Sequence, residues 1–147
     1  MLTTSAPAVP ELASRLRLAV TRTARRLRQQ SDPALSPTQV AALATIERAG
    51  PLTPSELAKI ERVQRPTISR VSARLAEAGL VERLPDELDG RGAQLRLTPQ
   101  GRSTLRALRR RKTAYLATRI RELPESDRRT LARAAEVLER LLESERA

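Results

Sequence analysis

The sequence predicts a mainly α-helical protein that carries one small β-hairpin, an α+β class in which helices dominate. Apolar residues recur at helical spacing in six segments, and prolines or hydroxyl residues stand at the start of several of them. Between the fourth and fifth helical segments, LVERL and AQLRL alternate apolar and polar positions around a loop that contains Asp89-Gly90. The expected order is therefore four helices, a hairpin and two further helices.

The chain is 147 residues long, which suits one domain with a real core or a small domain with helical extensions. Its 28 Lys and Arg against 17 Asp and Glu give a net charge of +11, which favours an acidic polymer or surface as partner. Lysine occurs only at Lys59 and Lys112, and the planar fork of arginine suits phosphates and guanine edges. A GC-rich genome would produce the same arginine bias.

Several classes of function are excluded by what the composition lacks. Without cysteine or histidine the chain can form no disulfide, no Cys/His zinc site and no catalytic dyad that uses either residue. The carboxylates are scattered and no Gly-rich phosphate loop is present, so we predict no enzyme, no cofactor and no metal. The single aromatic residue, Tyr115, cannot form a base-stacking platform, and double-stranded DNA fits better than a single strand.

The chain shows no targeting or membrane signal. The opening MLTTSAPAVP lacks the basic and long apolar regions of a signal peptide, and the apolar run VAALATI is too short to span a bilayer. We therefore predict a cytoplasmic protein without a membrane partner, in which residues 1–10 form a flexible N-terminal tail.

Three helices are expected before the middle of the chain. The first covers residues 11–30, with apolar residues along one side and arginines on the others. A capping box at residues 36–39, Ser-Pro-Thr-Gln, opens the second helix, which runs to about Arg48. The same capping-box pattern at residues 53–56, Thr-Pro-Ser-Glu, begins a third helix, which is too short to be stable unless it packs on its neighbours.

The later helices are marked by proline and glycine. Pro66 is expected to start the fourth helix, because a proline pushes its predecessor Arg65 out of helical geometry, and Gly79 ends it. After the hairpin, Thr98-Pro99 opens a fifth helix to about Leu123. Pro124 then separates it from a sixth with an apolar side.

The fourth helical segment has two distinct faces. A helical wheel gathers Ile68, Val71 and Leu75 into a buried stripe. The opposite face consists of Pro66, Arg70, Ala73, Arg74 and Glu77, flanked by Thr67 and Ser69. Its two guanidiniums suit guanine edges or phosphates, and its two hydroxyls suit base edges or backbone. With the short helix before it, this segment forms a helix-turn-helix that fits the major groove. The alternative is an ordinary solvated face.

The hairpin loop favours the DNA interpretation. Arg91 lies beside Asp89-Gly90 at the tip, where an arginine can reach into the narrow, electronegative minor groove. Otherwise it is an ordinary turn residue.

The sequence resembles the MarR family of winged helix-turn-helix regulators over nearly its whole length. The matching motifs are LTPSELAKIERVQRPTISRVSARLAEAGLVER, the wing signature DGR and LRLTPQG. The resemblance implies that the major groove is contacted by Gln64, Arg65, Pro66, Thr67, Ser69, Arg70 and Arg74, and the minor groove by Arg91. It also implies that Asp89 braces the wing by pairing with an arginine such as Arg83. Gln64 departs from the family, which usually has a better N-cap there.

The terminal helices have more apolar surface than a small winged-helix core can cover, which indicates burial against a second copy. Packing back on their own subunit is the alternative. We therefore expect residues 11–147 to form a single MarR-like domain, with a winged-helix DNA-binding part at about 36–98 and dimerisation helices at about 11–30 and 99–145. Two-fold symmetry then predicts a near-palindromic site with recognition helices roughly 34 Å apart.

Many relatives are released from DNA by small, often phenolic, ligands. Tyr115 is the candidate residue for such an effector pocket, although a plain core or interface role is the alternative, and an aliphatic pocket rimmed by arginine stays open. The basic run at residues 109–112 points around most of its helix, which is typical of a solvated, partly salt-bridged surface.

The leading hypothesis is a dimeric, sequence-specific DNA-binding repressor at the nucleoid in the cytoplasm. The alternative is an architectural, nucleoid-type protein that uses the same positive charge with little sequence preference and no ligand response.

Overall fold

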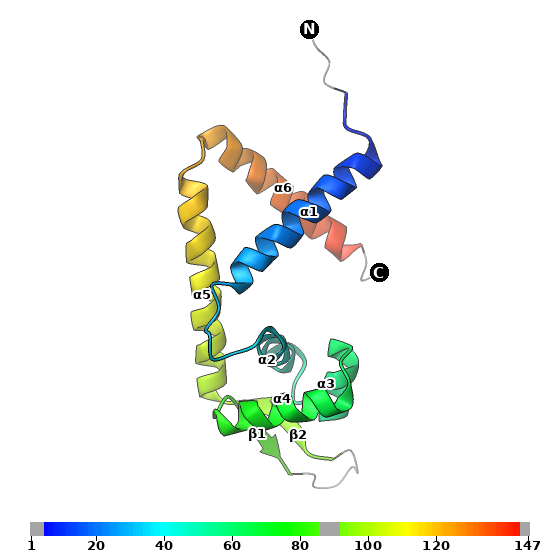
Figure 1. The fold of residues 1–147 in the computed structure, drawn as a ribbon, viewed down its shortest axis with the longest axis vertical. Coiled ribbons are helices and arrows are strands. Elements are labelled where there is room, and N and C mark those ends of the chain that lie inside the picture. The colour runs from blue at the N-terminus through cyan, green and yellow to red at the C-terminus, as the bar shows by residue number, and fades with distance from the viewer. Residues whose placement is uncertain (1–4, 86–91, 145–147) are drawn as a thin grey trace. The chain divides into compact units, whose positions relative to one another are not determined.

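The computed structural model describes residues 5–85 and 92–144, and within them it shows the expected order of helices and strands. Figure 1 shows the elements, which are α1 Val9–Arg28, α2 Pro37–Ala49, α3 Pro54–Glu61, α4 Arg65–Glu77, β1 Val81–Leu84, β2 Gln94–Leu97, α5 Pro99–Arg121 and α6 Glu125–Glu143. The mainly α fold with one hairpin is confirmed. The predicted loop residues Asp89 and Arg91, and residues 1–4 of the predicted tail, lie outside the described residues.

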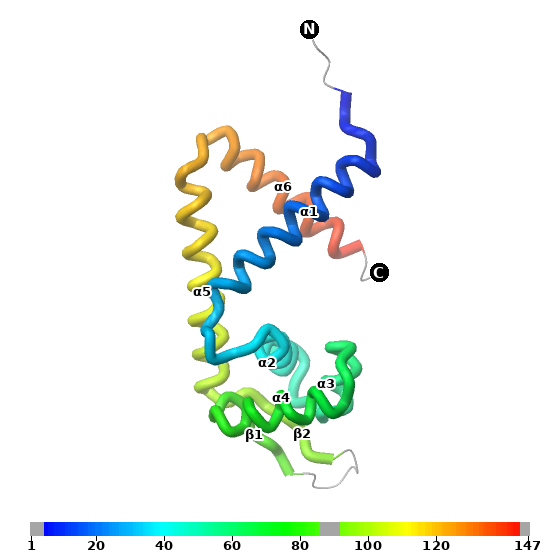
Figure 2. The backbone as a smooth tube through the Cα atoms, viewed as in Figure 1, coloured from blue at the N-terminus to red at the C-terminus, as the bar shows by residue number. Residues whose placement is uncertain are grey.

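The chain divides into two compact units, residues 1–112 and residues 113–147. The first unit contains α1 to α4, the hairpin and the beginning of α5, and the tube in Figure 2 can be followed through these elements in order. The second contains the end of α5 and all of α6. No described helix has the length and apolar character needed to cross a membrane.

The second and third helices begin with the capping boxes that the sequence predicts. The Ser36 hydroxyl accepts the Gln39 N–H at 3.1 Å, and the Gln39 side chain accepts the Ser36 N–H at 2.7 Å. Thr53 and Glu56 exchange the same two bonds at 3.1 and 3.4 Å. Each box satisfies two backbone donors that a helix start otherwise leaves without partners.

The fourth helix begins at Arg65, so the prediction that Arg65 lies outside the helix is wrong. Pro66 occupies the second helical position, and the Gln64 carbonyl accepts the Ile68 N–H at 3.1 Å. This bond encloses Arg65 in the first turn, which outweighs the preference of a residue before proline for extended geometry. Gln64 is the N-cap and its side chain makes no capping bond.

The end of α4 follows the prediction closely. Gly79 has a φ of 75°, a left-handed conformation that glycine adopts without steric cost. The Gly79 N–H bonds to the Ala76 carbonyl and the Leu80 N–H to the Leu75 carbonyl, both at 3.0 Å. These two bonds form a Schellman motif, which turns the chain from α4 directly into β1.

The hairpin is antiparallel and pairs Val81 with Leu97 and Leu84 with Gln94. Leu52, in the segment between α2 and α3, adds a single bridge to Leu95 through two backbone bonds of 3.1 and 2.6 Å. The hairpin is thus attached to the helical part by backbone hydrogen bonds as well as by packing.

One hydrophobic core lies between α2, α3, α4, the hairpin and the start of α5. The predicted stripe of Ile68, Val71 and Leu75 belongs to it, and the hydroxyl of Ser72 is buried beside them without a hydrogen-bond partner. By contrast, α1 and α6 each contain no fully buried residue. Their large apolar side chains are exposed, at Val9, Leu12, Leu16, Leu18, Val20, Leu131, Val137, Leu141 and Leu142.

Candidate nucleic-acid interface

A tight turn joins α3 to α4. Arg62 adopts the left-handed conformation, with a φ of 53° and a ψ of 45°, and its N–H bonds to the Lys59 carbonyl at 3.3 Å. The Val63 N–H bonds to the Ala58 carbonyl at 3.0 Å, and the Val63 side chain packs against the core. The turn is therefore fixed from the α3 side, and the two helices form the predicted helix-turn-helix.

The outer face of α4 carries the predicted major-groove residues. Thr67 is half-buried, while the other six are exposed: Gln64, Arg65, Pro66, Ser69, Arg70 and Arg74. Arg70 and Arg74 lie one turn apart, and neither forms an ion pair with any residue that the structure describes. Two unpaired guanidiniums on one exposed helical face are available for phosphates or base edges.

Two residues at the start of α2, the N-cap Ser36 and Gln39 in the first turn, lie beside this face, a position that the sequence did not predict. Ser36 and Gln39 line a shallow groove of about 230 Å³ together with Thr67, Arg70 and Arg74. Their capping motif was visible in the sequence, but it predicts only a helix start. Their proximity to α4 depends on how α2 and α4 cross, which no local pattern encodes.

A second groove lies at the helix-turn-helix turn. It has a volume of about 420 Å³ and is lined on the basic side by Lys59, Arg62 and Arg65. One guanidinium nitrogen of Arg65, Nη1, lies 2.6 Å from the hydroxyl oxygen of Ser55, in the first turn of α3. This contact connects the first residue of α4 to the beginning of the preceding helix.

The wing is described only at its base. Arg83 is exposed on β1, whereas its predicted partner Asp89 and the predicted minor-groove residue Arg91 lie outside the described residues. The base carries an ion pair between Glu82 and Arg96, which occupy directly opposite positions in the register. This pair was not predicted from the sequence, although strand alternation alone places both residues on the exposed face.

The candidate effector residue and the cavity of the first unit do not coincide. Tyr115 is half-buried in the second unit, with the Arg119 guanidinium 5.3 Å from the centre of its ring. In the first unit a cavity of about 520 Å³ has apolar walls that include Leu35, Val40 and Ala44, and Arg28 and Lys112 also line it. The residues that line this cavity do not include Tyr115.

Two further observations bear on chemistry. Among the described residues no group of three or more Asp and Glu side chains could hold a metal ion. Arg109 of the basic run pairs with Glu47 of α2 at 2.8 Å, so that run is partly salt-bridged as expected.

A helix-turn-helix followed at once by a two-stranded hairpin defines the winged-helix class of DNA-binding proteins. The MarR family model matches residues 35–92. An uncharacterized HTH-type transcriptional regulator of Mycobacterium bovis is 40% identical over 129 residues, covering 86% of this chain and 90% of the relative. The chain belongs to the MarR family of DNA-binding transcriptional regulators.

Solved structures agree with this membership. A transcriptional regulator from Pseudomonas aeruginosa is 34% identical with a TM-score of 0.78, and the match covers 92% of this chain and 98% of that one. A mutant of Staphylococcus aureus MepR bound to an oligodeoxyribonucleotide shares the fold with a TM-score of 0.69 at 20% identity, over 88% of this chain and 97% of that one.

Proposed function

We propose that this protein is a sequence-specific regulator that represses transcription by occupying a near-palindromic promoter site as a dimer. The observation that carries the proposal is the face of α4 that presents Arg70 and Arg74 to solvent, opposite a fully buried stripe. One side of this helix is buried in the core, and the arginines on its other side have no ion-pair partner among the described residues. Such a helix can enter a major groove without rearranging the core. The MepR neighbour, which is bound to an oligodeoxyribonucleotide, has the same fold.

The roles of the individual residues are part of the proposal. Thr67, Ser69, Arg70 and Arg74 contact the major groove together with Gln64 and Pro66. Arg91 contacts the minor groove, and Asp89 pairs with Arg83 to brace the wing.

The exposed apolar residues of α1 and α6 support the dimer. Leu142 is 61% exposed and Leu141 is 53% exposed in the single chain, and side chains of this kind gain from burial. We propose that the dimerisation helices at about 11–30 and 99–145 cover these residues in a second copy, and that residues 11–147 act as one domain with the DNA-binding part at about 36–98. Such a regulator would work at the nucleoid, in the cytoplasm.

The test is a selection of duplexes from a randomised library, followed by binding to the selected site and to a scrambled duplex at several salt concentrations. A specific regulator yields one motif with two-fold symmetry. Arg70→Ala is expected to lose about 1–3 kcal/mol on the selected site and to relax one position of the motif. The control Arg106→Ala removes an exposed α5 arginine and should weaken binding to both duplexes equally.

The same selection distinguishes the alternative function. An architectural protein would enrich no motif and would bind both duplexes with one affinity, and that result would replace the specific regulator with a DNA-coating protein.

The cavity of the first unit supports an effector as a second proposal. The charged residues that line this cavity are Arg28, Lys112 and Asp32, so cations outnumber anions two to one, and with the apolar walls they suit a small molecule that has an aliphatic or aromatic body and an anionic group. Ala44→Phe would fill part of this space and should abolish release from DNA by such compounds while leaving DNA affinity intact. If the compounds still release the Ala44→Phe variant from DNA but no longer release Tyr115→Ala, the effector site would lie at Tyr115 instead.

A further inference from the structure

The beginning of α4 lacks the anchor that the two preceding helices have. Both α2 and α3 open with reciprocal capping boxes, whereas Gln64 makes no capping bond and the first turn of α4 contains no acidic residue. An N-cap bond typically stabilises a helix start by about 1 kcal/mol. The helix that faces DNA thus begins without a local anchor.

A side-chain hydrogen bond to the preceding helix holds the start of α4 instead of a capping bond. Arg65, the first residue of α4, reaches back across the turn so that its Nη1 donates to the Ser55 hydroxyl at 2.6 Å. Ser55 lies in the first turn of α3, whose start is fixed by the Thr53–Glu56 capping box. The contact therefore connects the uncapped helix to a capped one.

The charges around this contact favour one position for Arg65. Lys59 and Arg62 line the same groove as Arg65, and among the described residues that line it there is no acidic residue that could pair with the guanidinium. The Ser55 hydroxyl is a neutral acceptor among them, and a hydrogen bond between a charged donor and a hydroxyl is stronger than a neutral one. A guanidinium held on α3 in this way does not point at a base edge.

We propose that Arg65 is a positioning residue that braces α4 against α3 through Ser55, and that it does not read DNA sequence. This proposal differs from the prediction that Arg65 contacts the major groove, and it rests on the proposed role of α4 as the recognition helix. The brace holds the first turn of α4, and hence Thr67 and Arg70, in the orientation that the groove requires.

A double-mutant cycle on the full-length protein tests this, with Ser55→Ala, Arg65→Ala and the double variant measured on the duplex selected by the wild type. If the brace matters, Ser55→Ala weakens binding about threefold to tenfold although every positive charge is kept. The double variant then binds no more weakly than Arg65→Ala, and the motif selected by Arg65→Ala equals that of the wild type. Ser103→Ala, an exposed serine of α5, is the matched control and should leave binding unchanged.

Amide hydrogen exchange of the DNA-free protein separates positioning from general stability. Ser55→Ala should speed exchange of the Ile68 amide in the first turn of α4 and leave the Ala78 amide at its end unchanged, although both bond to helix carbonyls. Equal acceleration at both ends would show a general loss of stability and overturn the proposal.

Two binding results would also overturn it. One is full affinity in Ser55→Ala together with a relaxed motif position in Arg65→Ala, which would make Arg65 a base-reading residue. The other is wild-type affinity in both single variants. If the wild type selects no motif, the proposed function fails, and the exchange experiment still decides whether the brace exists.

Discussion

Two buried residues, Gly101 and Ser72, have surroundings that make opposite predictions about the effect of a substitution on stability. Gly101, in the first turn of α5, is buried against the carbonyl of Leu80, and a Cβ at this position would overlap that oxygen. By contrast, the buried hydroxyl of Ser72 has no hydrogen-bond partner among the residues that the structure describes. Neither environment is visible in the motif that contains the residue.

Gly101→Ala is expected to destabilise the protein by about 2 kcal/mol or more, because backbone rather than a flexible side chain must move to admit the methyl group. Chemical denaturation measures the change. Ser103→Ala, two residues further along the same helix and exposed, should change the free energy of unfolding by less than about 0.5 kcal/mol. Equal stability of the two variants would contradict the close approach.

Ser72→Ala is expected to leave the free energy of unfolding unchanged or to raise it by up to about 1 kcal/mol, because a buried hydroxyl without a partner carries a desolvation cost. The neighbouring Val71→Ala should instead lower it by about 1–3 kcal/mol through lost apolar contacts. A clear loss of stability in Ser72→Ala would indicate a hydrogen bond to the Ser72 hydroxyl.

At the scale of elements, the beginnings and ends of helices could be predicted where the signal is local. The capping boxes at Ser36 and Thr53 and the glycine at Gly79 are sequence patterns whose partners lie within five residues, and all three are confirmed. The predicted start of α4 was one residue too late. A residue before proline prefers extended geometry, but the hydrogen bond from the Ile68 N–H to the Gln64 carbonyl holds Arg65 in the helix.

Contacts between elements could not be predicted in the same way. The bond from Arg65 to Ser55 and the groove that joins Ser36 to Arg70 depend on the angles between helices, which the side chains of the whole core determine together. The Glu82–Arg96 pair depends on the hairpin register, and the cavity depends on the connection between α1 and α2.

Ser36→Ala and Thr53→Ala should each lower the free energy of unfolding by about 0.5–2 kcal/mol, because each removes the acceptor of a capping bond. Thr53→Ala should also weaken DNA binding, since α3 supports the proposed brace of α4. Thermal denaturation and DNA titration of both variants check this. Glu56→Gln is the control, since an amide can keep the return bond to the Thr53 N–H.

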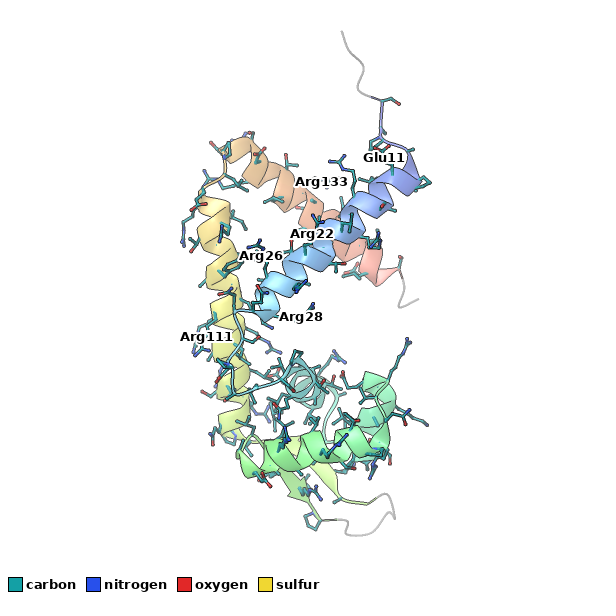
Figure 3. The ribbon with its side chains drawn as sticks, in the orientation of Figure 1. Glu11, Arg22, Arg26, Arg28, Arg111 and Arg133 are labelled. Atoms are coloured by element: carbon teal, nitrogen blue, oxygen red, sulfur yellow. The ribbon has the colours of Figure 1, made fainter. Side chains whose placement is uncertain are left out.

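At the scale of the whole molecule, the exposed apolar faces of α1 and α6 are the feature that a single chain leaves unexplained. Six arginines against one glutamate on α1 add a strongly positive surface, and Figure 3 shows Arg22, Arg26 and Arg28 along the C-terminal half of that helix. The sequence predicted the apolar faces from helical periodicity. Helical periodicity describes one helix at a time, so it cannot show what covers an apolar face.

Leu142→Glu is expected to shift a dimer towards monomer at micromolar concentration, because it places a charge within the exposed apolar face of α6. Light scattering after size exclusion measures the mass. Arg128→Glu, which changes charge in the first turn of the same helix, is the control and should keep the wild-type mass. A wild type that is monomeric under these conditions would contradict the proposed dimer.

The hydrogen bonds of Thr98 determine how a mechanical force passes from α5 to α4. Its hydroxyl donates to the Gly79 carbonyl at 2.6 Å and accepts the Gly101 N–H at 3.0 Å, while its own N–H bonds to the Leu80 carbonyl at 3.1 Å. Thr98, the residue before α5, is therefore bonded directly to the Gly79–Leu80 turn that follows α4, which couples the beginning of α5 to the end of α4. A rotation of the first turn of α5 would therefore pass through these hydrogen bonds to the end of α4, the helix that we propose enters DNA, and would not be absorbed by a flexible linker.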